Sequence, residues 1–256
     1  AEQLINGMIR EMRTSKPKVQ KIIDVLSSWD YKMEADSAGA LVYQVLIYKI
    51  IRNLVEQDLG KELTDKYMGL GDHPILIPSS ELLGHTSQAL FNILQNRNSK
   101  WISTTKEIML LFEKSMISTC KWIEQKMGYD SNLWRWGDIH HIEFRHNLSL
   151  NSILRKIFNL GPFPIGGDTD TVCQTAYNPS APYHATEWCP SIRMIIDVGD
   201  WDNSLIISPP GQSGVLGSKY YSSMTDKWLK GEYVPMLWDK NKIKSHSDSK
   251  MMLIPE

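Results

Sequence analysis

The sequence is poor in the features that identify several classes of protein. Its 256 residues include only Cys120, Cys173 and Cys189, too few for a disulfide framework and without the Cys-x-x-Cys spacing of a zinc site. No run approaches eighteen apolar residues, so we expect no membrane span, and the amino end lacks the apolar core of a signal peptide. Lys and Arg (28) nearly balance Asp and Glu (29). The chain therefore has no excess of positive charge that would attract nucleic acid. A bridge between Cys173 and Cys189 stays open if the chain works outside the cytoplasm.

Tryptophan and methionine are abundant, by contrast. The chain holds 9 Trp and 12 Met within a hydrophobic content of 42%, which is ordinary for a globular protein. Large apolar side chains of this kind usually form a core. Some of them could instead face a partner that lies outside this chain.

The first half of the chain, residues 1–128, is predicted to be mostly helical because its apolar residues recur every three or four positions. Pro17 suits a first helical turn, Thr104 or Thr105 can cap a helix, and Gly128 can end it. We expect helices over residues 2–13, 17–29, 38–59, 62–68, 82–94 and 104–127. The helix from residue 38 has an apolar surface wider than one stripe, so it should be buried on more than one side.

The second half, residues 129–256, is predicted to be a mixed region with antiparallel strands near its end. Ile192, Met194 and Ile196 alternate, Leu205 begins a second apolar run, and the sequence Gly-Asp-Trp-Asp-Asn between them is typical of a turn. Two prolines at 209–210 should end the second strand. We also expect helices over 148–158 and 222–230 and a last strand over 251–254. The predicted fold class is therefore α+β.

Four segments of the second half resemble, in the same order, the penicillin amidase (penicillin acylase) family. They are Trp134-Arg135-Trp136-Gly137, Phe144-Arg145-His146, Gly161-Pro162-Phe163-Pro164-Ile165-Gly166-Gly167-Asp168, and the stretch from Arg193 through Pro235. The resemblance is to the carboxyl-terminal portion of the family's larger (beta) chain. It implies a piece of the αββα architecture of the N-terminal nucleophile hydrolases, with both halves belonging to one domain whose head lies outside this sequence.

The resemblance also implies where the chemistry takes place. In this family, the serine that begins the larger chain attacks an amide, with its own α-amine as the base, whereas this sequence begins with Ala1, which has no nucleophilic atom. The family's nucleophile, oxyanion-hole asparagine and nearby arginine all precede the matching region, so we assign no catalytic, cofactor-binding or metal-binding residue here. We expect this chain alone to be inactive and to supply scaffold.

The complete enzyme implied by the resemblance is secreted or periplasmic. It would hydrolyse the amide of a penicillin, an acylated amine or an acyl-homoserine lactone, and its calcium site would lie outside this chain. The implied partners are the smaller chain and the amino-terminal part of the larger chain. A fragment that exposes an apolar patch should also self-associate as a homodimer or aggregate.

Two other groups of residues in the sequence are weaker candidates for a metal-binding or catalytic site. His140, His141, Glu143 and His146 form the densest set of metal-ligand types, but their spacing is neither His-Glu-x-x-His nor His-x-x-Glu-His, and residues 141 and 146 would lie about 140° apart on a helix. Ser213 lacks the glycine two residues later that a nucleophile elbow requires, since Val215 stands there.

Two acidic turns could bind calcium. Asp168 and Asp170 form one, and Asp200, Asp202 and Asn203 the other, but neither has EF-hand spacing. Acids in turns more often accept hydrogen bonds from nearby backbone. The stretch Gly166-Gly167-Asp168 also lacks the pattern of a phosphate-binding loop.

Two alternatives to the amidase prediction remain at this point. One is a stand-alone structural or interaction protein descended from such an enzyme. The other is an enzyme of another class built on the histidine cluster, which metal analysis would test.

Overall fold

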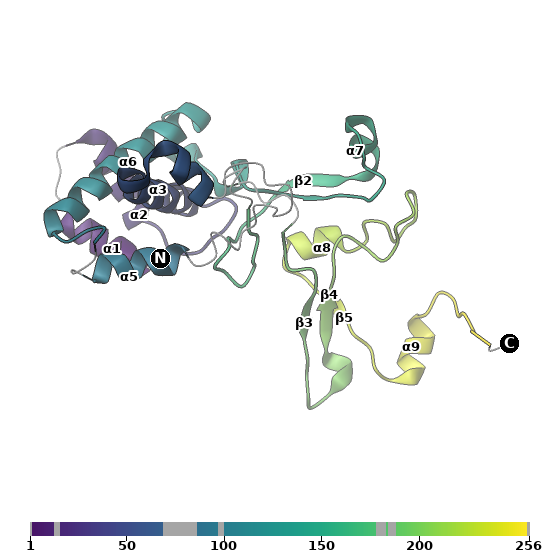
Figure 1. Cartoon of the computed structure of the whole chain (residues 1–256). Helices are drawn as coiled ribbons and strands as arrows, with labels where there is room; N and C mark the ends of the chain where they lie inside the picture. The colour runs from purple at the N-terminus through teal and green to yellow at the C-terminus, as the bar shows by residue number, and fades with distance from the viewer. Residues whose placement is uncertain are drawn as a thin grey trace. The chain divides into compact units, whose positions relative to one another are not determined.

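The computed structural model describes residues 2–12, 16–68, 86–96, 100–177, 183 and 188–254, which form two compact units (Figure 1). The first unit comprises Ala1–Phe144 and Gly161–Cys189, and the second comprises Arg145–Leu160 and Pro190–Glu256. The first unit therefore takes in part of the mixed half of the sequence.

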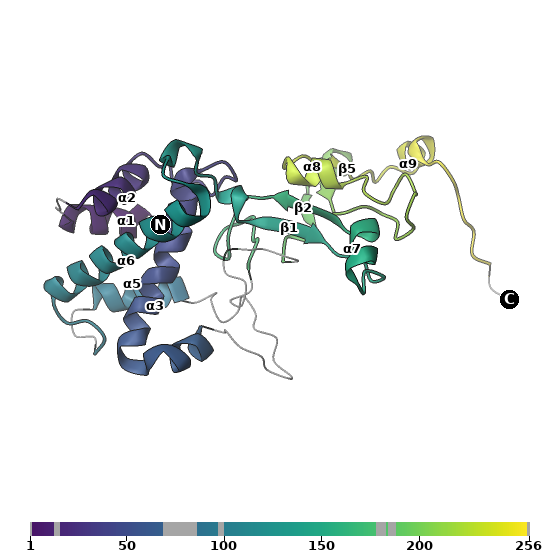
Figure 2. The ribbon, with the colours of Figure 1, turned by 90° about the horizontal axis from the view of Figure 1, so that it is seen from above.

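The first unit is a helical assembly around one central helix. Its helices are α1 (Glu2–Glu11), α2 (Pro17–Ser27), α3 (Ala38–Tyr67), α5 (Thr86–Gln95) and α6 (Thr105–Met127), followed by the short turns η1 (Ser131–Leu133) and η2 (Trp136–Asp138). Helix α3 packs against α2, α5 and α6. Figure 2 shows α2 and α6 beside it, together with the two-stranded sheet of β1 (His141–Phe144) and β2 (Leu160–Pro164).

Helix α3 is buried on more than one side, as predicted. The fully buried residues Leu41, Val42, Val45 and Leu46 are consecutive or nearly so, and therefore point in different directions around the helix axis. Burying each such side chain stabilises the fold by about 1.5–3 kcal/mol. Among the described helices, only α3 is long and apolar enough to cross a membrane, but 78% of that apolar window is buried inside the structure, as in a core helix.

The helices predicted over 38–59 and 62–68 form one element with a kink. Gly60 has φ 68°, a backbone conformation that glycine adopts most readily, and the helix resumes beyond it. The Thr64 hydroxyl donates to the Gly60 carbonyl at 2.7 Å, and the Arg52 guanidinium pairs with Asp65 across the kink at 2.6 Å. The kink is thus held by side chains on both sides of the glycine.

Local capping signals define other helix ends. Thr104 and Glu107 form a reciprocal capping box at the start of α6, and Gly128 ends it with φ 85°. The predicted helix over 148–158 begins only at Ser152, because the Asn151 side chain accepts hydrogen bonds from the amides of the first turn of α7 (Ser152–Phe158). The predicted start of the helix over 82–94 lies outside the described residues, and α5 covers its later part.

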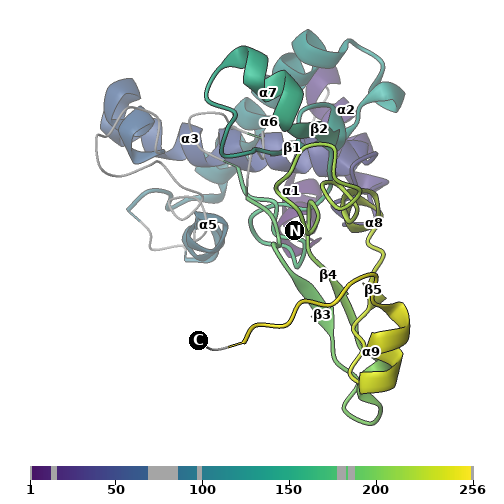
Figure 3. The same ribbon diagram turned by 90° about the vertical axis from the view of Figure 1, so that its right-hand side faces the viewer.

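The second unit contains the predicted hairpin, shown in Figure 3. Strand β3 (Arg193–Ile195) pairs antiparallel with β4 (Leu205–Ile207), in the register Arg193↔Ile207, and η3 (Trp201–Asn203) forms the turn. Strand β5 (Val234–Pro235) adds to the other edge of β4, and the helices of this unit are α7, α8 (Thr225–Leu229) and α9 (Lys240–His246). The predicted helix over 222–230 corresponds to α8.

The last predicted strand, Met251–Ile254, is wrong. These residues pair with no neighbouring strand and are exposed. An apolar run with high strand propensity becomes a strand only where another strand supplies hydrogen bonds. Strands β1, β2 and β5 and helix α9 were not predicted.

Lys18 and Lys21 on α2 both bind Glu124 on α6, whose side chain is only 8% exposed. Burial alone would raise the pKa of Glu124, but the hydrogen bonds from the two lysines outweigh it and hold the pKa at about 2. A lowered pKa means that the ionised carboxylate stabilises the fold above its ordinary pKa, and that this stabilisation is lost as the pH falls towards 2.

We therefore expect Glu124→Gln to lower the free energy of unfolding by about 1–2 kcal/mol at pH 7, with the difference shrinking in acid. Urea denaturation between pH 3 and about pH 7 measures this. The control is Glu62→Gln, which removes an exposed pair with Lys66 and should change stability by less than about 0.5 kcal/mol. Equal effects of the two substitutions would contradict the assignment.

Candidate functional site

In the first unit, two of the resemblance segments enclose the loop of residues 31–37. The Gly137 amide donates to the Ala35 carbonyl at 2.6 Å, and the Gly167 amide donates to the Met33 carbonyl at 2.7 Å. A Cβ atom added to Gly166 would lie 2.4 Å from the Met33 carbonyl oxygen, closer than real side chains come. The glycines of these segments therefore allow backbones to approach, which is a structural role.

His140 is fully buried beside this loop. Its ring stacks on Trp136 with centroids 4.2 Å apart, its Nδ1 lies 2.5 Å from the Tyr183 carbonyl oxygen, and its Nε2 lies 3.0 Å from the Thr175 hydroxyl. A carbonyl only accepts, so Nδ1 carries a proton and cannot also bind a metal. His140 thus connects the helical part of the unit to the segment after β2.

The four residues of the histidine cluster do not gather around one point. His141 and Glu143 lie on β1 and His140 is in the core of the first unit, whereas His146 belongs to the second unit, where its Nε2 lies 3.0 Å from the Gly214 carbonyl oxygen. Within the described ranges, no three His, Cys, Asp or Glu side chains are placed to hold a metal ion. Proximity in the sequence does not translate into a shared site here.

Asp168 is a buried carboxylate, only 5% exposed, against helix α3. Gln44 Nε2 donates to it at 2.5 Å, and the Asp170 amide donates to its other oxygen at 2.8 Å. Burial raises its pKa above the ordinary value. Calcium needs six to eight oxygen ligands. Asp168 supplies a single carboxylate, and both of its oxygens already accept hydrogen bonds from N–H groups. The adjoining cavity, of about 30 Å³ and lined also by Tyr43 and Tyr177, has room for about one water.

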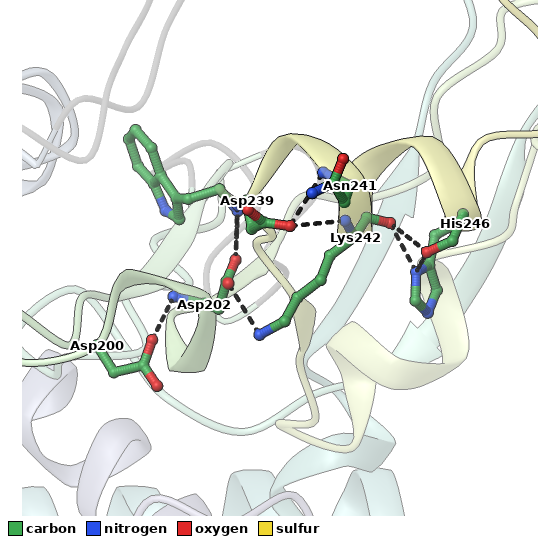
Figure 4. Close-up of polar contacts among 8 residues, drawn as sticks. Asp200, Asp202, Asp239, Asn241, Lys242 and His246 are labelled. Atoms are coloured by element: carbon green, nitrogen blue, oxygen red, sulfur yellow. Dashed lines mark hydrogen bonds and ion pairs between the residues drawn. The ribbon is translucent and has the colours of Figure 1, made fainter.

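The second acidic turn is the tip of the hairpin (Figure 4). One carboxylate oxygen of Asp202 accepts from the amides of Trp238 and Asp239 at 2.7 and 2.9 Å, and the other pairs with Lys242 at 2.9 Å. The Lys242 ammonium is the main cause that lowers the pKa of Asp202 to about 2. Asp200 accepts from the Asp202 amide, so both acids organise the turn.

Serine chemistry finds no support in the described residues. The Ser213 hydroxyl accepts from the Val215 amide at 3.1 Å, as in a turn, while His146 bonds the neighbouring Gly214. A cavity of about 550 Å³ in the first unit is lined by Ser28, Ser37 and Ser131 with three aspartates, yet its lining includes no histidine or lysine. The hydroxyls of Ser28 and Ser37 serve neighbouring backbone groups.

Asp168 generates a prediction for stability. A raised pKa means that the neutral carboxyl is favoured in the fold, so stability is greatest below the ordinary pKa of 3.8 and falls as the pH rises through the folded-state pKa. At pH 7 we expect Asp168→Asn to be about 1 kcal/mol more stable than a variant without the side chain's oxygens, because it removes a buried charge and keeps one oxygen that accepts from the Gln44 amide, although its NH2 group cannot accept from the Asp170 amide.

Asp168→Ala is the matched control, since it leaves the Gln44 amide without its acceptor and should cost about 1–3 kcal/mol. Urea unfolding of all three proteins gives the comparison. If Asp168→Asn were as destabilising as the alanine variant at pH 7, the fold would favour the ionised carboxylate instead.

Comparison with known proteins identifies the family. The family model for penicillin amidase matches residues 1–245. The acyl-homoserine lactone acylase QuiP of Pseudomonas aeruginosa is 24% identical over 237 residues, covering 86% of this chain and 27% of that protein. The penicillin acylase 2 proenzyme of Pseudomonas sp. strain SE83 is 28% identical over 237 residues, covering 92% and 29% respectively.

A solved structure agrees at the level of fold. The thermostable penicillin G acylase from Alcaligenes faecalis matches 99% of this chain and 45% of its own, with a TM-score of 0.54 at 10% sequence identity. The predicted α+β fold class is confirmed. The chain spans about 27–29% of the length of these two curated relatives. With the family match covering nearly its whole length, the chain belongs to the penicillin amidase family, whose members hydrolyse amide bonds.

Proposed function

We propose that this chain is the carboxyl-terminal portion of the larger chain of an amide hydrolase, and that it supplies scaffold while the nucleophile lies elsewhere in the same enzyme. The observation that carries the proposal is the combination of a family match over residues 1–245 with coverage of only 27–29% of the relatives. The hydroxyls of Thr175 and Ser245 lie within hydrogen-bond distance of a histidine. Each also donates to a backbone carbonyl, that of Gly166 or Lys242 respectively, rather than serving as an activated nucleophile, in keeping with this division of roles.

The substrate we propose is an N-acyl compound, either a penicillin or an acyl-homoserine lactone. One relative is named for each of these substrates. Both contain a carboxamide that joins an acyl group to an amine. The reaction would proceed through an acyl-enzyme on an amino-terminal serine, with the hydroxyl activated by the serine's own amine.

The second unit supports the proposal that a partner is required. Its described residues include only two fully buried large apolar side chains, Ile207 and Trp228, whereas Met194, Ile195 and Val198 of the hairpin are exposed. A unit of this size with so small a core is poorly stabilised by itself. The partner that we propose is the remainder of the same enzyme, whose strands would pair with the edge of β3 that no strand of the described residues occupies.

A stand-alone, non-catalytic protein is the second candidate. The extensive core of the first unit favours it, because that unit buries helices α2, α3 and α6 against one another without further chain. The small apolar core of the second unit argues against it.

One experiment separates the two candidates. The coding frame upstream of Ala1 is read, and the mature protein's chain ends are determined by mass spectrometry. We expect a frame that continues to a serine that becomes the first residue of a chain, and hydrolysis of a chromogenic N-acyl anilide or an N-acyl-homoserine lactone only when that part is present. Replacing that serine with alanine should abolish turnover. A start codon adjacent to Ala1 would rule out the amidase proposal and leave the stand-alone candidate.

The exposed hairpin also predicts the behaviour of the 256-residue chain alone. We expect it to self-associate at high concentration, because large exposed apolar patches are rare on monomers. Light scattering should show species larger than a monomer, and Ile195→Lys should reduce their proportion. A monomer at all concentrations would count against a missing partner.

A further inference from the structure

The segment Arg145–Leu160 of the second unit turns apolar side chains outward. Leu150 is 84% exposed and Ile153 is 70% exposed, and Leu148 and Ile157 are exposed as well. Ile153 and Ile157 lie one turn apart on α7, so they share a side of the helix. Figure 1 shows α7 as a short helix within this segment.

This segment is held in one conformation by hydrogen bonds. The Leu148 amide donates to His146 Nδ1 at 3.1 Å, so that nitrogen must be unprotonated, and Nε2 then carries the proton that bonds Gly214 at 3.0 Å. The imidazole stacks on Phe158 with centroids 5.0 Å apart, and the Tyr221 hydroxyl donates to the Phe158 carbonyl. The apolar side chains are thus presented on a fixed frame, which lowers the entropy lost on binding.

The loop held by His146 extends the apolar surface. Val215 and Leu216 directly follow Gly214 and are both exposed. We define the α7 face as Leu148, Leu150, Ile153, Ile157, Val215 and Leu216. Lys156 is exposed on α7 next to the side shared by Ile153 and Ile157, so a basic group flanks this face, whereas Arg155 lies on the opposite side of the helix.

We propose that the α7 face is a docking surface for the remainder of the same enzyme, which would meet it with an apolar patch and an acidic side chain placed to pair with Lys156. This inference rests on the proposed function. Most of the length of the relatives lies outside the region matched here, so polypeptide is available to cover the face. The second unit buries little apolar surface of its own, so this contact would add to its stability.

The test uses the complete reading frame with the double substitution Ile153→Asp and Ile157→Asp. Because both side chains are exposed in the chain alone, the variant chain of 256 residues should keep the wild-type melting temperature. In the complete enzyme, two buried charges should lower the yield of assembled protein about tenfold. Hydrogen exchange of residues 148–158 should be slower in the complete wild-type enzyme than in the chain alone.

The matched control is Val172→Asp, at a position in the first unit that is 103% exposed, and it should assemble like the wild type. The proposal would be overturned if the double variant assembled with the same yield as the wild type and showed the same hydrogen exchange. Equal exchange rates of residues 148–158 in the complete enzyme and in the chain alone would also overturn it, because the remainder of the enzyme would then not cover the face.

Two other occupants would give different results, each of which overturns the proposal. If the double substitution abolished self-association of the chain alone, the occupant would be a second copy. If the chain bound vesicles of phosphatidylcholine and phosphatidylglycerol through this face, it would be a membrane surface. Failure of the amidase proposal is recognised separately, by the absence of an upstream frame or of amide hydrolysis.

Discussion

The first unit depends on the close approach of three backbone segments: the loop of residues 31–37, the turn that contains Gly137, and the Gly166-Gly167 stretch. The amide-to-carbonyl bonds of 2.6 and 2.7 Å at Ala35 and Met33 leave no space for side chains, so glycine is required where the chains touch. The loop leads directly into α3, whose first turn is capped by Ser37. The position of the central helix relative to the segments after α6 is therefore set by backbone contacts rather than by side-chain packing alone.

The buried side chains of His140 and Asp168 beside that contact have hydrogen-bond partners within the unit. His140 bonds to Thr175 and to the backbone of residue 183, and Asp168 bonds to Gln44 and its own turn. Groups of this kind are costly to bury without partners, and each bond specifies one arrangement of the segments. His140 and Asp168, whose residue types suggest catalysis, join helices to loops here, and the glycines of two of the family's segments let backbones approach each other.

Features encoded by neighbouring residues could be predicted from the sequence. The capping box of Thr104, the helix end at Gly128 and the hairpin turn before Leu205 depend on contacts within a few positions. The family could be recognised as well, because four of its motifs occur in the family's order along the second half of the sequence. Strands β1, β2 and β5 could not be predicted, since each is only two to five residues long and exists through a distant partner. The sequence also could not show that the residues of the histidine cluster belong to different units, because that depends on how the chain folds beyond them.

The hydrogen bonds between Asp202 and the start of α9 join residues that are 36 and 37 positions apart in the sequence. Their acceptor belongs to the hairpin turn, whereas their donors are the amides of Trp238 and Asp239, and the Trp201 and Trp238 rings pack 4.9 Å apart beside them. The turn and the helix start consequently form one cooperative element, and neither opens without breaking the bonds of the other. Force applied to α9 would be transmitted to the tip of the hairpin through the Asp202 carboxylate and the packed rings of Trp201 and Trp238.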